Sequence, residues 1–166
     1  MVEKRDSIIK DSVSIVARLM GASAITAPKA RGIDNVVVGI ISEREELEKL
    51  ANEMRSLATE YGSFFARDAN NVENSDAVLL IGCKIVDTGI KQPKELEYDV
   101  NLVLNIINLG IAIGSAVKTA SLLNVDNRVM YSIGIAAKKL GILDADIILG
   151  IPLSVRAKSI YFDRRI

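Results

Sequence analysis

The sequence has no histidine and only one cysteine, Cys83, among its 166 residues. The lack of histidine excludes Ser-His-Asp and Cys-His nucleophilic chemistry and imidazole-ligated metals. One cysteine excludes an intramolecular disulfide and a cluster held by four thiolates of one chain. We therefore expect no metal site and no iron–sulfur cluster. The low cysteine content and a charged N-terminus without a signal-peptide pattern predict a cytoplasmic protein.

Aromatic residues are also scarce, with four Tyr, three Phe and no Trp, and 21 basic residues balance 21 acidic ones. A chain with few stacking platforms and no net charge is a poor match for a polyanion, so we expect no nucleic-acid partner. Hydrophobic residues make up 49% and charged residues 25% of the chain, which is typical of a globular protein. The length predicts a single domain over residues 1–166.

The densest polar chemistry lies in the stretch 26–35, between an apolar helical segment and the first strand-like run. Pro28 gives this stretch a rigid entry, Lys29 and Arg31 supply two cations, and Asn35 supplies an amide. We interpret it as a loop that could bind a small-molecule ligand.

Hydrophobic periodicity and turn residues predict the elements around this loop. The predicted helices cover residues 6–24, 42–62, 64–72, 97–124 and 128–140, and the predicted strands cover 36–41, 77–81 and 146–152. Because residues 36–41 are apolar on both faces, they are predicted as a central strand. Ser42 and Glu45 are predicted to form a capping box, and Asp126-Asn127 to cap the last helix. Residues 87–95 are read as a loop mobile enough to serve as a lid.

The longest apolar segment, residues 97–124, carries Asn101, Asn105 and Asn108 along one face. A polar stripe would be costly in lipid, so we expect a buried amphipathic helix and no membrane span. Gly110 and Gly114 favour a close approach to another helix, in the core or across a dimer axis, and we expect a homodimer.

The strand over 146–152 is predicted to end in a turn formed by Gly150 and Pro152. A basic tail follows, with Arg156, Lys158, Arg164 and Arg165. Cys83, at the end of the second strand, is interpreted as a small buried hydrophobic residue because the chain has no histidine that could activate its thiol.

Four segments together resemble the family of uncharacterised ferredoxin-domain-containing proteins: TAPKARGIDN (26–35), LGIAIGSA (109–116), VDNRVMYS (125–132) and GIPLS (150–154). The activity of that family is unassigned. Its members typically carry a cysteine-rich stretch before the long helix, whereas residues 84–100 contain no cysteine here. The resemblance therefore implies an architecture and not a bound cluster.

A more distant resemblance is to the nitroreductase-like flavoproteins, in which a helix leads into an Ala-Pro-Ser-x-x-Asn loop and a late strand ends in Gly-x-Pro before a basic tail. Residues 27–31 and 149–152 resemble these two motifs, although Lys29 replaces the serine. The resemblance implies an α+β helix/sheet sandwich with a mostly buried central sheet, long packed helices, and FMN at a dimer interface. The residues implied to bind the cofactor are Pro28, Lys29, Arg31, Asn35, Gly150, Pro152, Arg156 and Lys158.

Two functional hypotheses follow, and neither assigns a catalytic residue. The first is a flavin-dependent oxidoreductase, in which FMN carries the redox chemistry and the protein supplies position and electrostatics. The alternative is a non-enzymatic binding or assembly subunit that keeps the dimeric scaffold after loss of a cysteine-ligated cluster. A fold shared with flavoproteins does not by itself decide between them.

Overall fold

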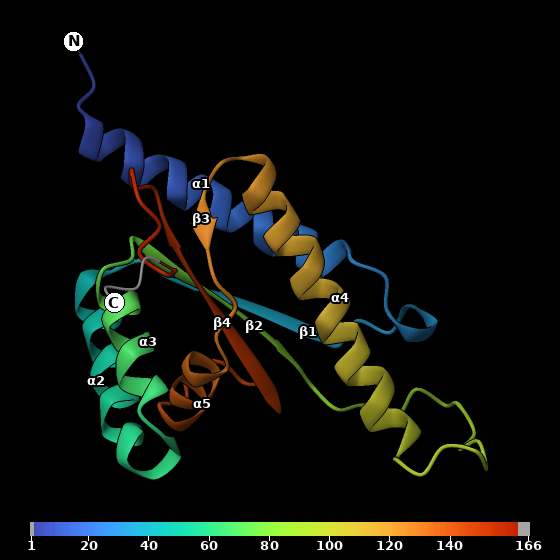
Figure 1. Ribbon diagram of the computed structural model, residues 1–166. Coiled ribbons are helices and arrows are strands. Elements are labelled where there is room, and N and C mark those ends of the chain that lie inside the picture. Colours follow the sequence, from blue (N-terminus) through green and yellow to red (C-terminus); the bar gives the residue numbers. More distant parts are fainter. Residues whose placement is uncertain (1, 163–166) are drawn as a thin grey trace.

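The computed structural model describes residues 2–162, which form two helical layers around one antiparallel sheet (Figure 1). The long helices α1 (Arg5–Thr26) and α4 (Val100–Leu122) cover one face of the sheet. The helices α2 (Arg44–Tyr61), α3 (Phe64–Glu73) and α5 (Tyr131–Lys139) cover the other. This arrangement confirms the expected α+β sandwich with long packed helices.

The sheet has the strand order β1-β2-β4-β3, and neighbouring strands are antiparallel. Its strands are β1 (Val36–Ile41), β2 (Ala77–Cys83), β3 (Asp126–Asn127) and β4 (Ile147–Ser154). Every residue of β2 is buried, because β2 has a strand on each side and a helical layer on each face. The central strand is therefore β2, and a continuous apolar run is what such a position requires.

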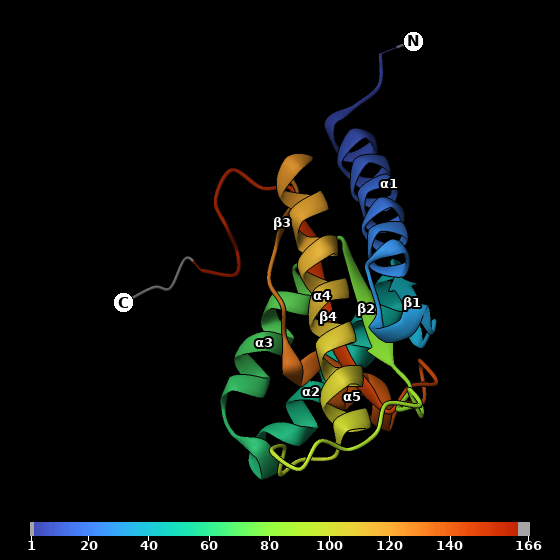
Figure 2. The ribbon, with the colours of Figure 1, turned by 90° about the vertical axis from the view of Figure 1, so that its right-hand side faces the viewer.

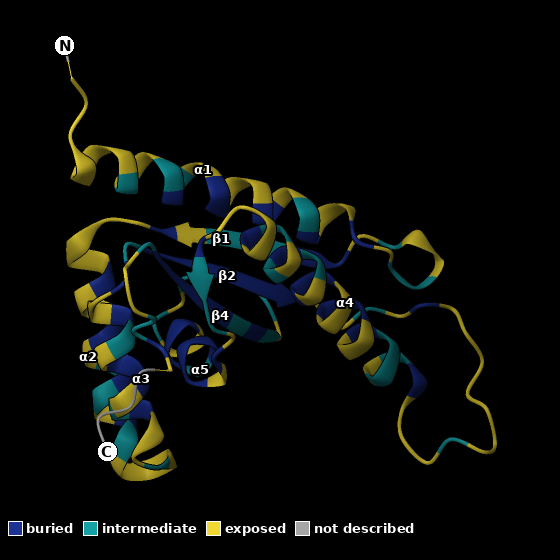
Figure 3. Ribbon diagram, turned by 45° about the horizontal axis from the view of Figure 1, so that its top comes forward, coloured by how far each residue is buried: buried dark blue, intermediate teal, exposed yellow. Residues whose placement is uncertain are grey.

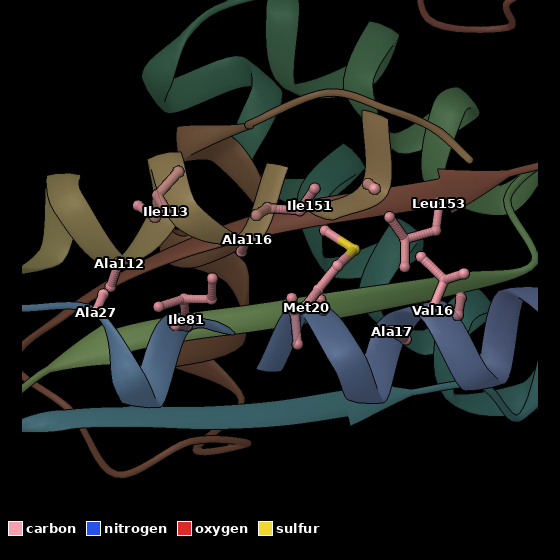
Figure 4. Packing of buried hydrophobic residues seen from close by; sticks show 14 of the residues in the cluster. Val16, Ala17, Met20, Ala27, Ile81, Ala112, Ile113, Ala116, Ile151 and Leu153 are labelled. Carbon is pink, nitrogen blue, oxygen red and sulfur yellow. The ribbon is translucent and has the colours of Figure 1, made fainter. Parts of the chain in front are cut away.

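The two faces of the sheet have separate cores, because successive side chains of a strand point to opposite sides. Met20 of α1 and Ala116 of α4 meet Ile81 and Leu153 of the sheet on one face (Figure 4). Figure 2 shows the C-terminal half of α4 lying beside α1, with the N-terminal part of α4 continuing beyond the end of α1. On the other face, Phe65 of α3 belongs to a cluster of side chains from α2, α5 and the sheet. The residues of the two clusters alternate along β2, which accounts for its unbroken apolar sequence.

The expectation that residues 36–41 form a central strand is wrong, because among the described residues β1 pairs with β2 alone and forms the edge of the sheet. Its residues are less buried than those of β2, and Ile40 is 41% exposed. A continuous apolar run indicates that a strand packs against other parts of the fold, but it does not reveal whether the strand has one neighbour or two.

The predicted capping box at Ser42 is wrong. Helix α2 starts at Arg44 with Glu43 in the capping position, and no side chain of the described residues caps it. Its predicted end is confirmed, since the helix stops at Tyr61 and Gly62 follows with φ 115°.

The role predicted for Asp126 and Asn127 is also wrong. They form β3, opposite Ser154 and Leu153, and α5 begins five residues later, at Tyr131. A short polar pair favours a helix cap when only local sequence is considered, but pairing with a distant strand overrides that preference here. Lys138 and Lys139 lie in the last turn of α5, where a cation complements the helix dipole.

Strand β4 runs through Gly150 and Pro152, so the predicted turn at these residues does not exist. A Cβ atom on Gly150 would lie 2.0 Å from Ile133 Cγ2, which shows that α5 packs directly on the bare backbone there. The register that pairs Asp126 with Ser154 and Met130 with Gly150 places Arg128 opposite Pro152, beyond the end of β3. Proline is tolerated there because the missing N–H falls where the ladder is already interrupted.

Helix α4 is long and apolar enough to span a membrane by length and composition, with a mean hydropathy of 1.9 over its most apolar window. In the fold it packs on α1 and on the sheet, with Asn105 and Asn108 buried on its inner face. Its outer face is apolar and open to solvent, with Leu102, Ile106 and Ile111 exposed (Figure 3). The expectation of no membrane partner stays a prediction.

Candidate functional site

The two cations of the 26–35 loop are both engaged within the fold. Lys29 is almost completely buried, and its Nζ donates to the carbonyl oxygens of Ile25 and Ala27, the latter at 2.9 Å. These carbonyls belong to the last turn of α1, where a cation complements the helix dipole. Lys29 thus completes the end of a helix, and the structure does not place it toward a ligand. Pro28, just before it, is exposed.

Arg31 lies in the short 3-10 helix at residues Ala30–Gly32 and has φ 54°, a left-handed conformation that is uncommon for a residue other than glycine. Its Nη1 donates to the carbonyl oxygen of Thr88 at 3.0 Å. That bond joins the loop to the segment after β2. Backbone strain of this kind is typical of sites that the surrounding structure holds in place.

Asn35 is 5% exposed and lies among other amides of the interior. It donates to the carbonyl of Lys84 at 2.9 Å and to Asn105 Oδ1, and it accepts from Asn108 Nδ2 at 3.3 Å. The stripe of asparagines visible in the sequence of α4 therefore does not face solvent or lipid. It binds the polar backbone of two loops, which is how buried amides are normally satisfied.

The basic residues after β4 line two hollows that share Arg156, together named here the Arg156 cleft. One hollow, of about 690 Å³, is also lined by Asn70, Asn71, Asn74, Lys158, Ser159 and Ile160. The other, of about 410 Å³, is also lined by Arg5, Asp6, Ile9, Lys10 and Asp76. The first hollow contains cations and amide groups and no carboxylate, which suits an anionic, hydrogen-bonding ligand, whereas the second also contains the carboxylates of Asp6 and Asp76.

Arg156 is oriented in this cleft by Asp76, to whose two carboxylate oxygens its Nη atoms donate at 2.7 and 2.8 Å. This pairing raises the pKa of the Arg156 guanidinium, which stays charged. Asp76 also accepts from the backbone N–H of Val155 at 3.4 Å. The bidentate contact therefore ties the C-terminal segment to the turn before β2. Arg164 and Arg165, also expected to act in this tail, lie outside the described residues.

Other residues that the sequence analysis did not single out also hold the C-terminal segment in place. Tyr161 is 3% exposed, and its hydroxyl lies 3.1 Å from Ser75 Oγ. Arg128 donates to the carbonyl of Tyr161 at 3.0 Å and lies over the ring of Phe162. Burial raises the pKa of the Tyr161 phenol to about 12. No local pattern marks these residues, since their partners lie far away in the sequence.

The structure thus separates the predicted site residues into two groups at opposite ends of the sheet. Val36, which follows the loop, pairs with Cys83, and Cys83 pairs with Ile147 at the start of β4. Arg156 follows the far end of the same strand. At a rise of about 3.4 Å per residue, the eight residues of β4 separate the ends by roughly 25 Å. One small ligand cannot touch both groups in a single chain. Gly150 and Pro152, buried within β4, join neither group.

Cys83 is fully buried at the end of β2, as expected for a small hydrophobic residue. Burial, with a smaller contribution from the negative charge of Asp146, raises the pKa of its thiol to about 11. A thiol with that pKa is overwhelmingly protonated near neutral pH and is a weak nucleophile.

Comparison with solved structures shows that the fold is that of the nitroreductases. The nitroreductase family protein of Clostridium novyi NT has a TM-score of 0.61 at 16% identity, with 96% of this chain and 80% of that chain covered. The hypothetical oxidoreductase YcnD of Bacillus subtilis has a TM-score of 0.61 at 13% identity, with 87% of this chain covered. The present chain spans only 58% of the length of YcnD. At these identities the likeness establishes the fold.

The chain belongs to a family described as "Uncharacterized protein containing a ferredoxin domain (DUF2148)", which its residues 99–164 match. An uncharacterized protein of Archaeoglobus fulgidus is 42% identical over 171 aligned positions, which cover 93% of this chain and 92% of the relative. The family match begins at residue 99, close to the end of the cysteine-free segment 84–100. Both resemblances noted in the sequence are thereby confirmed.

Proposed function

We propose that two copies of the protein form a homodimer that binds FMN and acts as a flavin-dependent oxidoreductase. The observation that carries the proposal is the separation of the candidate residues: the loop at one end of the sheet and the Arg156 cleft at the other. A site that needs both groups requires two chains. Among the similar structures, one is described as an NADPH:FMN oxidoreductase from Vibrio harveyi and another as a BluB-like flavoprotein from Clostridium difficile 630.

Helix α4 offers the surface for such a dimer. Its outer face exposes Leu102, Ile106, Ile107 and Ile111, a larger apolar stripe than isolated surface residues produce. Cβ atoms on Gly110 and Gly114 would meet nothing within 4 Å among the described residues, so these glycines do not serve packing inside the chain. They permit a second helix to approach closely.

The position of the glycines also favours a two-fold arrangement. Gly110 and Gly114 lie near the middle of α4, whose first half binds the loop through Asn108 and whose end leads to β3 beside Ser154. If two α4 helices cross antiparallel at the glycines, the loop of one copy faces the Arg156 cleft of the other. An isologous contact of this kind produces two identical sites.

The donor set of the cleft fits the phosphate end of FMN. In the first hollow, Arg156 and Lys158 supply charge-assisted donors, and the amides of Asn70 and Asn71 supply neutral ones. In the proposed dimer, Pro28 and the backbone of the loop would border the flavin ring from the partner copy. When bound, the flavin supplies hydride and electron transfer, and the protein supplies position and exclusion of water.

The alternative, a scaffold without redox activity, is favoured by one observation: both cations of the loop, Lys29 and Arg31, already bind carbonyl groups of the fold. We propose that the phosphate contacts come from the Arg156 cleft instead, so that flavin binding does not need them. The proposal includes no iron–sulfur cluster, because one cysteine per chain cannot supply the four thiolate ligands.

The test combines light scattering with FMN titration followed by visible absorbance. We expect a dimer that binds FMN, and we expect Arg156→Gln to weaken binding about tenfold or more because a charged hydrogen bond to phosphate is lost. Lys94→Gln is the matched control and should leave binding unchanged; it lies in the projecting segment, residues 84–99, between β2 and α4 (Figure 1).

A second pair of variants tests the dimer. Ile111→Glu places a charge on the exposed face of α4 and should yield monomers that no longer bind FMN. Tyr61→Glu, equally exposed but on the opposite layer, should stay dimeric and bind FMN. Failure of the purified protein to bind micromolar FMN, or undiminished binding by a monomeric Ile111→Glu variant, would refute the proposal.

A further inference from the structure

Three buried asparagines connect segments that lie far apart in the sequence. Asn35 belongs to the loop, and Asn105 and Asn108 belong to α4; each of them is 5% exposed or less. Helical spacing places Asn105 and Asn108 on the same face of α4. Figure 1 shows that this half of α4 lies beside both the loop and the segment 84–99.

The amides form a head-to-tail chain in which each accepts from one neighbour and donates to the next. The N–H of Ala30 donates to Asn108 Oδ1 at 2.8 Å, Asn108 Nδ2 donates to Asn35 Oδ1 at 3.3 Å, and Asn35 Nδ2 donates to Asn105 Oδ1. Asn105 Nδ2 then donates to the carbonyl of Val86 at 2.9 Å. The chain therefore begins in the loop and ends in the segment after β2.

A second set of hydrogen bonds connects the segment after β2 back to the loop. The backbone N–H and the hydroxyl of Thr88 donate to Asn101 Oδ1 at 2.9 and 2.7 Å. The carbonyl of the same threonine accepts from Arg31 at 3.0 Å, which returns to the loop. Thr88 is only 1% exposed. Since a buried amide left without its partner is costly, loss of one bond weakens the arrangement of the others.

The rest of the projecting segment forms a second block. The amide of Gln92 donates to the carbonyls of Leu96 and Tyr98 at 2.8 and 3.0 Å and accepts from the N–H of Val100 at 2.9 Å. The two blocks meet at Gly89, whose φ is 66°. Hydrogen bonds thus hold the base of the predicted lid, and Gly89 supplies the left-handed backbone conformation between the two blocks.

We propose that Asn35, Asn105 and Asn108 are positioning residues that hold the loop and the base of the projecting segment, residues 84–88, as one cooperative unit. A ligand that orders the loop then orders residues 84–88, and a contact made on that segment tightens the loop by the same factor. In relation to the cofactor, this inference rests on the proposed function. The coupling itself is a property of the chain without flavin.

The experiment measures amide hydrogen exchange of the flavin-free protein. Asn108→Leu keeps the volume but removes the bonds to Ala30 and Asn35, and it touches nothing in residues 84–88 directly. We expect exchange in residues 84–88 to become about tenfold faster, as well as exchange in the loop. Ser132→Ala, which removes an equally buried hydrogen bond to Asp68 in the other layer, is the control and should change neither segment.

A reciprocal variant keeps the test decisive if Asn108→Leu folds poorly. Thr88→Val preserves the shape of the side chain and removes only its hydroxyl bond to Asn101, at the base of the projecting segment. It should accelerate exchange in residues 29–33. Faster exchange confined to the mutated segment, in either variant, would overturn the coupling.

The result is separable from flavin binding. If the wild-type protein binds FMN, Asn108→Leu should weaken binding about tenfold and alter the bound flavin's visible spectrum, and Ser132→Ala should do neither. If the wild-type protein does not bind FMN, the proposed function fails, while the exchange of residues 84–88 still decides the coupling. Unchanged FMN affinity and spectrum in a variant with accelerated exchange would overturn the positioning role.

Discussion

Gly134 is the position where we expect the addition of a single methyl group to lower the stability of the fold most. It lies in α5, and a Cβ atom built there would be 1.7 Å from the carbonyl oxygen of Ile148 and 2.5 Å from its carbonyl carbon. Both are backbone atoms of β4, which cannot rotate away as a side chain could. Gly134→Ala therefore forces helix and sheet apart.

Two opposing effects determine how much Gly134→Ala changes the free energy of unfolding. Alanine favours a helix interior over glycine by about 1 kcal/mol. Against this, ordinary contact begins at 3.4 Å, so α5 must withdraw by 3.4 − 1.7 = 1.7 Å from β4. That movement opens the interface in which Ile133 and Ala137 are fully buried, and overpacking of this severity costs at least about 3 kcal/mol. We expect a net loss of roughly 2–3 kcal/mol in the free energy of unfolding.

Urea denaturation and a thermal melt measure this loss. For a chain of this size, each kcal/mol corresponds to about 2–4 °C, so Tm should fall by roughly 4–12 °C. Gly114→Ala is the matched control, because its Cβ would meet nothing within 4 Å among the described residues and should stabilise the fold slightly. Both are best compared in the monomeric Ile111→Glu background. Equal stabilities for the two alanine variants would refute the reasoning.

Three further outcomes are expected. Lys29→Met should lower stability by about 1 kcal/mol while leaving phosphate and FMN affinity unchanged, because the ammonium group caps α1; a large loss of affinity in the titration would contradict this. Cys83 should resist alkylation at pH 8 until the protein unfolds, because its thiol has a pKa of about 11, and rapid labelling of the native protein would show otherwise. Stability should fall as pH rises from 10 toward 12, because the Tyr161 phenol ionises near 10 when unfolded but near 12 when folded; a urea series should show a smaller fall for Tyr161→Phe.

Periodicity and turn residues determined where the main elements lie. Apolar spacing located α1, α2, α3 and α4 to within a few residues, and the continuous apolar runs located β1 and β2. The absence of histidine and the single cysteine settled which chemistry is excluded, because no fold can supply missing ligands.

Tertiary structure decided the neighbours of each element. Nothing in the run 36–41 shows that β1 is an edge, because a continuous apolar run does not reveal whether a strand has one neighbour or two. Gly150 and Pro152 resemble a turn when only local sequence is considered. In the fold, Gly150 is needed because α5 packs on its bare backbone, and Pro152 is tolerated because β3 is too short to pair with it. The hydrogen-bond partners of Asn105 and Asn108 in α4 belong to loops about 20 to 80 residues away, which the sequence of the helix does not reveal.

The candidate site depended on the tertiary structure most of all. Proline, cations and amides in residues 26–35 predicted a ligand loop, but the fold uses Lys29 to end a helix and Arg31 to bind Thr88. The antiparallel run of β4 carries Arg156 to the far end of the sheet. Residue types can be read along the chain, whereas hydrogen-bond partners are set by packing between distant segments, and that packing directs the proposed site to two copies of the chain.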